Sequence, residues 1–259
     1  MFITVDNATL FAAAFGPKMS VPILALGGWI GSWEDWLEPL SILSESQRVI
    51  AFDHRGCGIS LAPVESITFD RLVDDVFAVL DAYDAQRCVL AAMSMGAAVA
   101  LGAALKHPDR IAALVLVNPL DLSAQPAGDA DPFLRALTYD YPRALQGFIE
   151  ACIVEPDSAH LKHWGWHILN RASQDAAIAL YRMSQSISFG SALARVTQPT
   201  LIIHGESDGL VPLESARWLA ETLPDARLEV IEGAGHVPVL TRPVEVAREI
   251  AWFINEIDE

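Results

Sequence analysis

The sequence predicts an α/β fold, in which a mainly parallel, twisted sheet is flanked by helices and a helical cap is inserted. Short apolar runs alternate with helical patterns over residues 1–119 and again over 197–259, as a parallel sheet with right-handed crossovers requires. Most strand candidates read as apolar runs and not as alternating patterns, which is typical of a sheet covered on both faces. Residues 120–196 instead show helical patterns rich in aromatic residues, without a buried-strand pattern. We therefore predict a core of 1–119 and 197–259 and a cap of 120–196.

The individual elements follow from local patterns in chain order. Two strand candidates on either side of Asn7 indicate a hairpin, and the third candidate runs into a glycine-rich turn. Thr68 precedes a helical pattern and is a good N-cap for it. The predicted strands are 2–5, 10–15, 21–26, 48–52, 89–92, 111–117, 200–204 and 227–231. The predicted helices of the core are 34–43, 70–83, the alanine-rich run after Ser94, 214–223 and 244–257, and a polar bridge at 124–131 leads into the cap.

Composition limits the possible partners. The formal net charge is −16, and without a basic patch we expect no binding of nucleic acid. No apolar run reaches the roughly 20 residues that span a bilayer, and the N-terminus lacks a signal-peptide pattern, so we expect no membrane association and a cytoplasmic location. Cys57, Cys88 and Cys152 are widely spaced, which predicts free thiols. The expected partner is a small-molecule substrate, no cofactor is expected, and the oligomeric state is not readable from the sequence.

Ser94 stands where a buried-strand pattern stops and an alanine-rich helical pattern starts. A strand-to-helix turn this tight strains the backbone of its central serine and turns the hydroxyl outward. Small neighbours are needed there, and Ala92 and Gly96 supply them. The usual pattern is G-x-S-x-G, so Ala92 replaces its first glycine. Ser94 is therefore a candidate nucleophile.

A serine nucleophile needs a base to take its proton and a third group to orient that base. The strand predicted at 200–204 is followed by Glu206 and Asp208, and the strand predicted at 227–231 is followed by His236. Active sites of parallel sheets lie at the carboxyl ends of the strands. The order serine, acid, histidine is also the one used by hydrolases on such sheets. We therefore expect Ser94, an acidic residue and His236 to meet at that edge.

The chain resembles the α/β-hydrolase superfamily over nearly its whole length. The resemblance rests on five segments in the same order: the glycine-rich turn 27–32, D-x-R-G-x-G-x-S at 53–60, the elbow at Ser94, H-G-x-x-D-x-x-x-P at 204–212, and G-x-G-H at 233–236. It implies the α/β-hydrolase fold, with a catalytic triad and an oxyanion hole. In this family the segment 53–60 is mostly a structural loop, so Asp53 and Arg55 are not taken as an acid pair. His54 is expected to be solvated or structural.

The resemblance also implies roles for individual residues. Ser94 is expected to be the nucleophile, His236 the general base and Asp208, in preference to Glu206, its orienting carboxylate. The backbone N–H groups of Trp29 and Met95 are expected to form the oxyanion hole. Where the family commonly has His-Gly, this chain has Gly27-Gly28, so a buried side chain that helps to order this loop is missing.

An apolar pocket beneath the cap is expected to hold the substrate, with Gly28, Met93 and Trp164 as candidate binding residues. The expected reaction is hydrolysis of a small to medium, largely apolar carboxylic ester, lactone or thioester through an acyl-enzyme on Ser94. Carbon–carbon bond hydrolysis and cofactor-free perhydrolysis could use the same triad. A protein of another class, a low-turnover ligand receptor or signalling partner, would show the same residues.

Two further groups of side chains in the predicted cap are candidates for binding a ligand. Arg135, Arg143, Lys162 and Arg171 are candidates for binding a substrate carboxylate, as carbon–carbon bond hydrolysis would require. His160, His163 and His167 have a spacing that can hold a metal ion on one helix face. They lack a matching carboxylate, and we expect Gly165 to interrupt the helix. No metal site is therefore predicted.

Overall fold

The structure is a computed structural model that describes residues 1–19, 21–123 and 131–257. Eight strands form one sheet in the order β1-β2-β4-β3-β5-β6-β7-β8. The first hairpin pairs antiparallel, β2 also pairs antiparallel with β4, and all other neighbours are parallel. The strands are β1 (Phe2–Val5), β2 (Ala8–Phe15), β3 (Ile23–Leu26), β4 (Val49–Phe52), β5 (Cys88–Met93), β6 (Ile111–Val117), β7 (Thr200–Gly205) and β8 (Ala226–Ile231). The predicted α/β class and the mainly parallel sheet are confirmed.

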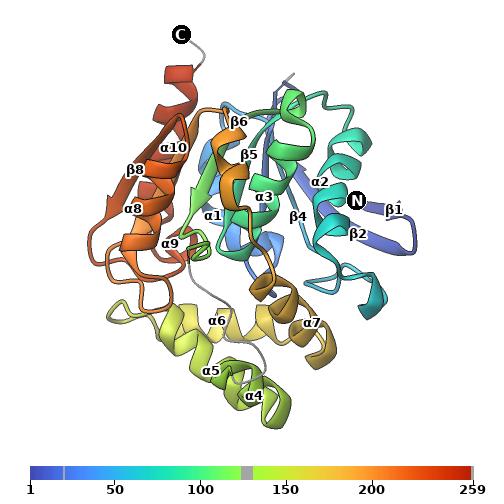
Figure 1. Ribbon diagram of the computed structural model, residues 1–259, viewed down its shortest axis with the longest axis vertical. Helices are drawn as coiled ribbons and strands as arrows, with labels where there is room; N and C mark the ends of the chain where they lie inside the picture. The colour runs from blue at the N-terminus through green and yellow to red at the C-terminus, as the bar shows by residue number, and fades with distance from the viewer. Residues whose placement is uncertain (20, 124–130, 258–259) are drawn as a thin grey trace.

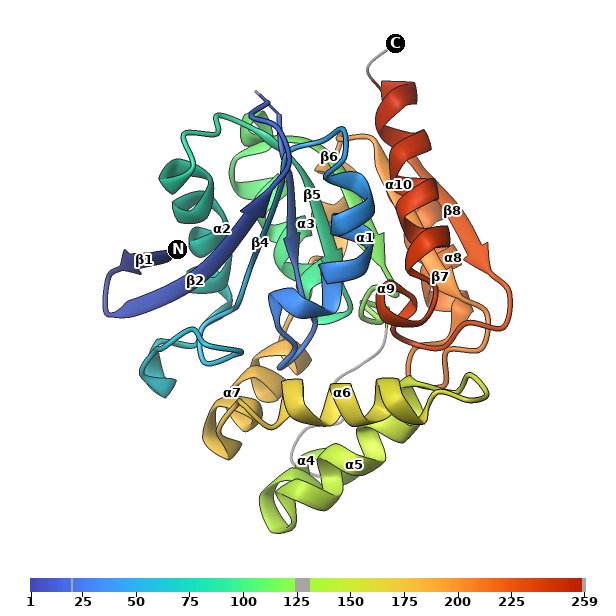
Figure 2. The same ribbon diagram turned by 180° about the vertical axis from the view of Figure 1, so that it is seen from behind.

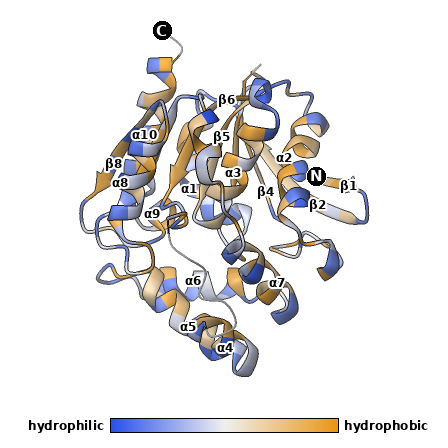
Figure 3. Cartoon of the chain, in the orientation of Figure 1, coloured by the Kyte–Doolittle hydropathy of each residue, from blue (hydrophilic) through white to orange (hydrophobic). Residues whose placement is uncertain are grey.

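Helices cover both faces of this sheet (Figures 1 and 2). One face is covered by α2 (Phe69–Ala82), α3 (Met95–Lys106) and α8 (Leu213–Thr222), and the other by α1 (Leu37–Leu43) and α10 (Pro243–Ile257). Each face has its own buried cluster, because neighbouring residues of a strand point to opposite sides. The central strands are hydrophobic along their length, whereas the surrounding helices also carry hydrophilic residues (Figure 3).

Four helices form a separate layer at the carboxyl ends of the strands, below the sheet in Figure 1. They are α4 (Pro132–Tyr139), α5 (Tyr141–Cys152), α6 (Ala159–Leu169) and α7 (Gln174–Gln185), and we call them the helical layer. They lie within the segment predicted as a cap, whose boundaries at 120 and 196 stay predictions. Most of the predicted polar bridge, residues 124–130, lies outside the described residues.

The structure departs from the sequence prediction in three local details. The helix predicted at 34–43 begins as a 3₁₀ turn, Trp33–Trp36, which Ser32 and Asp35 cap reciprocally before α1 starts. A short extra helix, α9 (Pro238–Thr241), precedes α10. The expectation that Gly165 interrupts its helix was wrong, because α6 continues through it. A single glycine costs a helix only about 1 kcal/mol relative to alanine, which packing against α5 offsets. Within the described part of the chain, no helix is both long and apolar enough to cross a bilayer.

Candidate active site

Ser94 lies in the sharp turn between β5 and α3. Its backbone has φ 52° and ψ −121°, a conformation that non-glycine residues adopt only under strain. The turn is held from both sides, since the Ser94 N–H donates to Val117 O at 2.9 Å and the Leu120 N–H donates to Ser94 O at 3.2 Å. A side chain at Gly96 would collide with Gly27 O, which its Cβ would approach to 2.4 Å. The chain therefore needs glycine at 96, whereas Ala92 fits within the regular ladder of β5.

Three side chains from three strand ends meet in one hydrogen-bonded line. His236 Nε2 lies 2.9 Å from Ser94 Oγ, and His236 Nδ1 lies 2.7 Å from Asp208 Oδ2. A carboxylate oxygen accepts hydrogen bonds, so Nδ1 carries the proton in this contact. In the neutral ring Nε2 is then an acceptor for the Ser94 hydroxyl. Glu206, the alternative acid, is exposed and accepts from the Gly233 N–H at 3.1 Å.

Asp208 is held as an anion by the donors around it. Burial by itself would raise the pKa of Asp208, but hydrogen bonds from His236, Asn118 and the Val211 N–H outweigh burial and lower it to about 2. The Asn118 amide donates to Asp208 Oδ2 at 2.6 Å, and the Val211 N–H donates to Oδ1 at 3.0 Å. The charge needed to orient a histidine is thus present throughout the neutral pH range.

The loop that carries His236 is fastened to the helical layer. The His236 N–H donates to Cys152 O at 2.9 Å, where α5 ends. The preceding Gly235 N–H donates to Glu155 Oε1 at 3.0 Å, and Glu155 is itself buried. A Cβ at Gly235 would approach Cys152 O to 2.6 Å. The position of His236 therefore depends on residues far from it in the sequence.

Two backbone N–H groups beside Ser94 are unused. Among the described residues, neither the Trp29 N–H nor the Met95 N–H donates to an acceptor of the protein. Met95 is also the first residue of α3, and a helix start favours negative charge. The Trp29 side chain is fixed by a hydrogen bond from Nε1 to Ala177 O of α7 at 2.8 Å. An oxygen that acquires negative charge next to Ser94 would find these donors.

His54 stabilises the glycine loop that precedes Trp29. Its Nε2 lies 3.2 Å from Gly27 O, and a carbonyl only accepts, so Nε2 carries the proton. Burial lowers the pKa of His54 to about 4, which keeps the ring neutral. The sequence lacks a histidine at 27, but His54, which follows β4, contacts the carbonyl of Gly27. Of the two roles expected for His54, solvated or structural, the structure shows the structural one, because its residue exposure is only 1%.

Four more ionisable side chains support this edge of the sheet. Arg55 forms a buried bidentate ion pair with Asp75 of α2, with N–O distances of 2.6 and 2.7 Å. Asp53 accepts from the Trp33 N–H at 2.7 Å and the Ile59 N–H at 2.9 Å. Burial raises the pKa of Asp53 to about 6 and that of Asp35 to about 7. These groups hold loops in place and do not contact Ser94.

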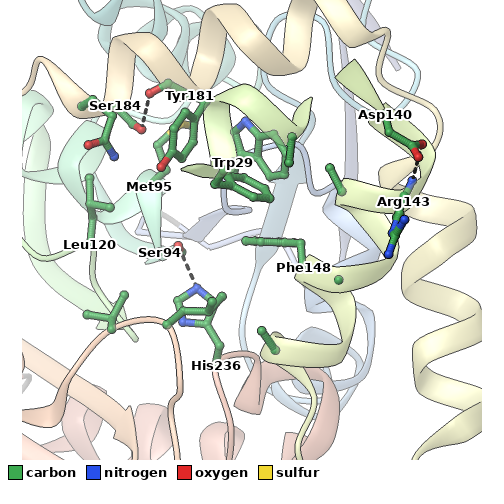
Figure 4. A pocket seen from close by; sticks show the side chains of 18 residues that line it. Trp29, Ser94, Met95, Leu120, Asp140, Arg143, Phe148, Tyr181, Ser184 and His236 are labelled. Atoms are coloured by element: carbon green, nitrogen blue, oxygen red, sulfur yellow. Dashed lines mark hydrogen bonds between the residues drawn. The ribbon is translucent and has the colours of Figure 1, made fainter. Parts of the chain in front are cut away.

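A large cavity opens between Ser94 and the helical layer (Figure 4). Its volume is about 580 Å³, within the range typical of sites for small molecules. Four aromatic rings, from Trp29, Phe133, Phe148 and Tyr181, pack against one another along its wall with centroids 5.1–6.1 Å apart. The exposed residues that also line it are Ala136, Asp140, Arg143, Gly147 and Leu210.

A second, small cavity lies on the other side of Ser94 and His236. Its volume is about 60 Å³. Most of its wall is apolar, with Met93, Ile149 and Ile153 among the lining residues, and Gly28 and Asp35 also line it. No residue that lines this cavity is exposed. The two cavities share Trp29, Ser94, Phe148 and His236, so a group bonded to Ser94 Oγ can extend into either.

Comparison with known proteins agrees with this architecture. The sequence pattern described as "Alpha/beta hydrolase family" matches residues 23–249. The chain belongs to the alpha/beta hydrolase family. It is 30% identical over 276 residues to a non-heme chloroperoxidase of Streptomyces lividans, covering 97% of this chain and 98% of that protein. It is 28% identical over 253 residues to a protein of Pseudomonas savastanoi pv. phaseolicola named as a candidate carbamate hydrolase, RutD, covering 90% and 94%. An esterase from Exiguobacterium antarcticum superimposes with a TM-score of 0.90 at 24% identity, over 100% of this chain and 99% of that one.

In this alpha/beta hydrolase, two of the three residues predicted to bind substrate line a cavity beside Ser94, and one does not. Gly28 and Met93 line the small cavity, and Gly28 is so close to Ser94 that a Cβ there would approach Ser94 Cβ to 3.2 Å. Trp164 lines neither cavity and is 37% exposed. Its position on α6 could not be judged from the sequence, because only the packing of α6 decides which face looks toward Ser94.

Of the basic residues predicted to bind a substrate carboxylate, one lines a cavity and three do not. Arg143 lines the large cavity, whereas Lys162 pairs with Glu150 and Arg171 pairs with Glu34, and Arg135 is exposed and lines neither cavity. His163 and His167 are neighbours on α6, with 3.1 Å between their Nε2 atoms. Among residues 1–19, 21–123 and 131–257, no three His, Cys, Asp or Glu side chains gather as a metal site.

Several residues of the alpha/beta hydrolase site were not singled out from the sequence. Asn118 directly follows β6, as Ser94 follows β5, and that position at a strand end was a usable signal. Glu155 and Asp35 gave no such signal, since their contacts join segments that only the fold brings together. The three cysteines are buried, and burial raises the pKa of each thiol, which makes them poor nucleophiles.

Proposed function

We propose that this alpha/beta hydrolase is a serine hydrolase that cleaves a carboxylic ester, lactone or thioester, with Ser94, His236 and Asp208 as its catalytic triad. The observation that carries the proposal is the hydrogen-bonded line of 2.9 Å and 2.7 Å from Ser94 Oγ through His236 to Asp208, at the floor of a cavity of about 580 Å³. A hydroxyl with an oriented base beside it is an activated nucleophile. The mostly apolar wall of the cavity favours a largely apolar substrate.

The proposed reaction has two halves. In the first, Ser94 Oγ attacks the substrate carbonyl carbon while His236 Nε2 takes the hydroxyl proton, and the carbonyl oxygen becomes negatively charged. The Trp29 and Met95 N–H groups, which have no acceptor within the described protein, donate to that oxygen. His236 then gives the proton to the leaving group. In the second half, water loses a proton to His236 and attacks the acyl carbon. The bond from that carbon to Ser94 Oγ breaks, the carboxylic acid leaves, and His236 returns the proton to Oγ.

The decisive experiment is labelling with a fluorophosphonate probe, followed by turnover of a short series of p-nitrophenyl esters. We expect one label per chain and many turnovers in the wild type, and in Ser94→Ala no label and a kcat lower by about 10⁴–10⁶. A Ser94→Ala variant that keeps full turnover would overturn the assignment. A single turnover in the wild type, with tight retention of the product, would instead indicate the ligand receptor.

A second reaction at the same site is supported by the likeness to a non-heme chloroperoxidase. Hydrogen peroxide in place of water would attack the acyl-enzyme and yield a peroxyacid without a cofactor. The same acyl group and the same three side chains are used, so only the second half of the reaction differs. Adding peroxide and acetate to the purified protein, with a peroxyacid-specific dye as readout, measures this activity, and Ser94→Ala is its control.

A further inference from the structure

The small cavity beside Ser94 has a feature that the proposed reaction does not explain. Its wall is almost wholly apolar, yet Asp35 lines it. Among the described residues that line it, Asp35 is the only carboxylic acid. Burial of a carboxylate costs free energy unless something compensates it. The pKa of Asp35 is raised to about 7, and burial is the largest cause of this shift.

Asp35 uses only one of its two carboxyl oxygens in the fold. Oδ2 accepts from the Ser32 N–H at 3.0 Å and lies so close to Gly31 that a Cβ there would approach it to 2.1 Å. Oδ1 has no hydrogen-bond partner among the described residues, and it is not sealed from the cavity as a buried unpaired atom would be. The side chain is thus fixed by Oδ2 and has Oδ1 left for a ligand.

The order of the reaction decides which part of a substrate enters this cavity. The leaving group departs first, while the acyl group stays bonded to Ser94 and water has yet to enter. A leaving group in the small cavity, none of whose lining residues is exposed, would have to leave past the acyl group. The large cavity has exposed residues at its rim, so it can release the leaving group and admit water. The acyl group therefore belongs in the small cavity.

The volume of the small cavity limits the acyl group. At about 60 Å³ this cavity is far smaller than the large cavity of about 580 Å³, so it takes the smaller of the two parts of an ester. We propose, on the basis of the function proposed above, that this enzyme takes esters of a large apolar alcohol with a short acyl group, and that Asp35 Oδ1 selects acyl groups carrying a hydrogen-bond donor. A hydroxyacyl group is the simplest member of this class, and a carbamoyl group is a nitrogen analogue.

Three esters of 2-phenylethanol test the proposal: the hydroxyacetate, the propanoate and the hexanoate. Hydroxyacetyl and propanoyl groups have nearly the same size and differ in one hydroxyl. The ratio of their kcat/KM values is measured at pH 8 in the wild type and in each variant. Comparing the ratio between variants cancels the intrinsic reactivity of the two esters. At that pH Asp35 is mostly a carboxylate and accepts the hydroxyl proton.

We expect the hexanoate to have a kcat/KM at least about 10-fold below that of the propanoate. Asp35→Leu should lower the hydroxyacetate-to-propanoate ratio by about 10- to 100-fold, the usual effect of a hydrogen bond to a charged group. Asp35→Asn is the variant expected to fold like the wild type, because its amide oxygen can still accept from the Ser32 N–H. Its NH₂ group then faces the cavity and cannot accept, so the ratio should fall here too.

The matched control is Ser32→Ala. It removes the hydroxyl that accepts from the Glu34 N–H at 3.1 Å in the same turn, but it leaves the cavity wall unchanged, so we expect an unaltered ratio. A hexanoate hydrolysed as fast as the propanoate would overturn the placement of the acyl group. An unchanged ratio in both Asp35 variants would overturn the role of Asp35. Failure of the proposed function is separate, because turnover of all three esters would then survive in Ser94→Ala.

Discussion

The carboxyl edge of the sheet and the helical layer that faces it are built from different kinds of contact. At the sheet edge, Ser94, Asp208 and His236 each follow directly from a strand or its adjoining loop, and short hydrogen bonds join them. In the helical layer, apolar and aromatic side chains pack to form a cavity wall. Hydrogen bonds fix atoms to a few tenths of an ångström, whereas apolar packing fixes mainly volume and shape. The sheet edge is therefore suited to chemistry and the helical layer to selection.

The largest effect that we expect is the loss of turnover when Asp208, at the sheet edge, is replaced. Asp208→Asn removes the charge that orients His236, so we expect kcat to fall by about 10⁴ for every ester, whatever its size. Stopped-flow or steady-state turnover of one short-alcohol and one large-alcohol ester measures this. Glu206→Gln is the control, since Glu206 is exposed and its variant should remain within about threefold of the wild type. Equal losses in both variants would contradict the assignment of the acid.

A change in the helical layer should act on one substrate and spare another. Phe133 of α4 contacts the rings of Trp29, Phe148 and Tyr181, so Phe133→Ala opens the wall of the large cavity. We expect about a tenfold lower kcat/KM for a 2-phenylethyl ester and little change for the ethyl ester of the same acid. Tyr139→Ala, on the exposed end of the same helix at 82% exposure, is the matched control. Equal losses for both esters would place Phe133 with the sheet-edge residues.

The smallest expected effect concerns stability and comes from Asp35, which lies where the two regions meet. Its pKa is raised from 3.8 to about 7 in the folded protein. Its contribution to stability is thus fully present below pH 3.8 and is lost as the pH rises through about 7. Asp35→Asn avoids this loss, so its Tm relative to the wild type should rise on the order of 5 °C between pH 5 and pH 8. Differential scanning calorimetry measures it, with the exposed Asp109→Asn as control. A pH-independent difference would contradict the burial of this carboxyl group.

The same division explains what the sequence could predict. Residues at the sheet edge stand directly after apolar strand patterns, so their neighbours in space follow from their neighbours in sequence, as with Ser94 after β5. The α/β class and the parallel sheet were predictable for the same reason. Trp164 shows the opposite case, because the face of α6 that meets the cavity depends on how α6 packs. Asp35 and Glu155 were missed because their partners are brought to them only by the complete fold.

One hydrogen bond joins the sheet edge to the helical layer. The His236 N–H donates to Cys152 O at the end of α5, so a movement that carries α5 away from the sheet also withdraws the imidazole from Ser94. With the imidazole withdrawn, Ser94 would have no base to take its proton, so turnover would be lost although all three side chains were present.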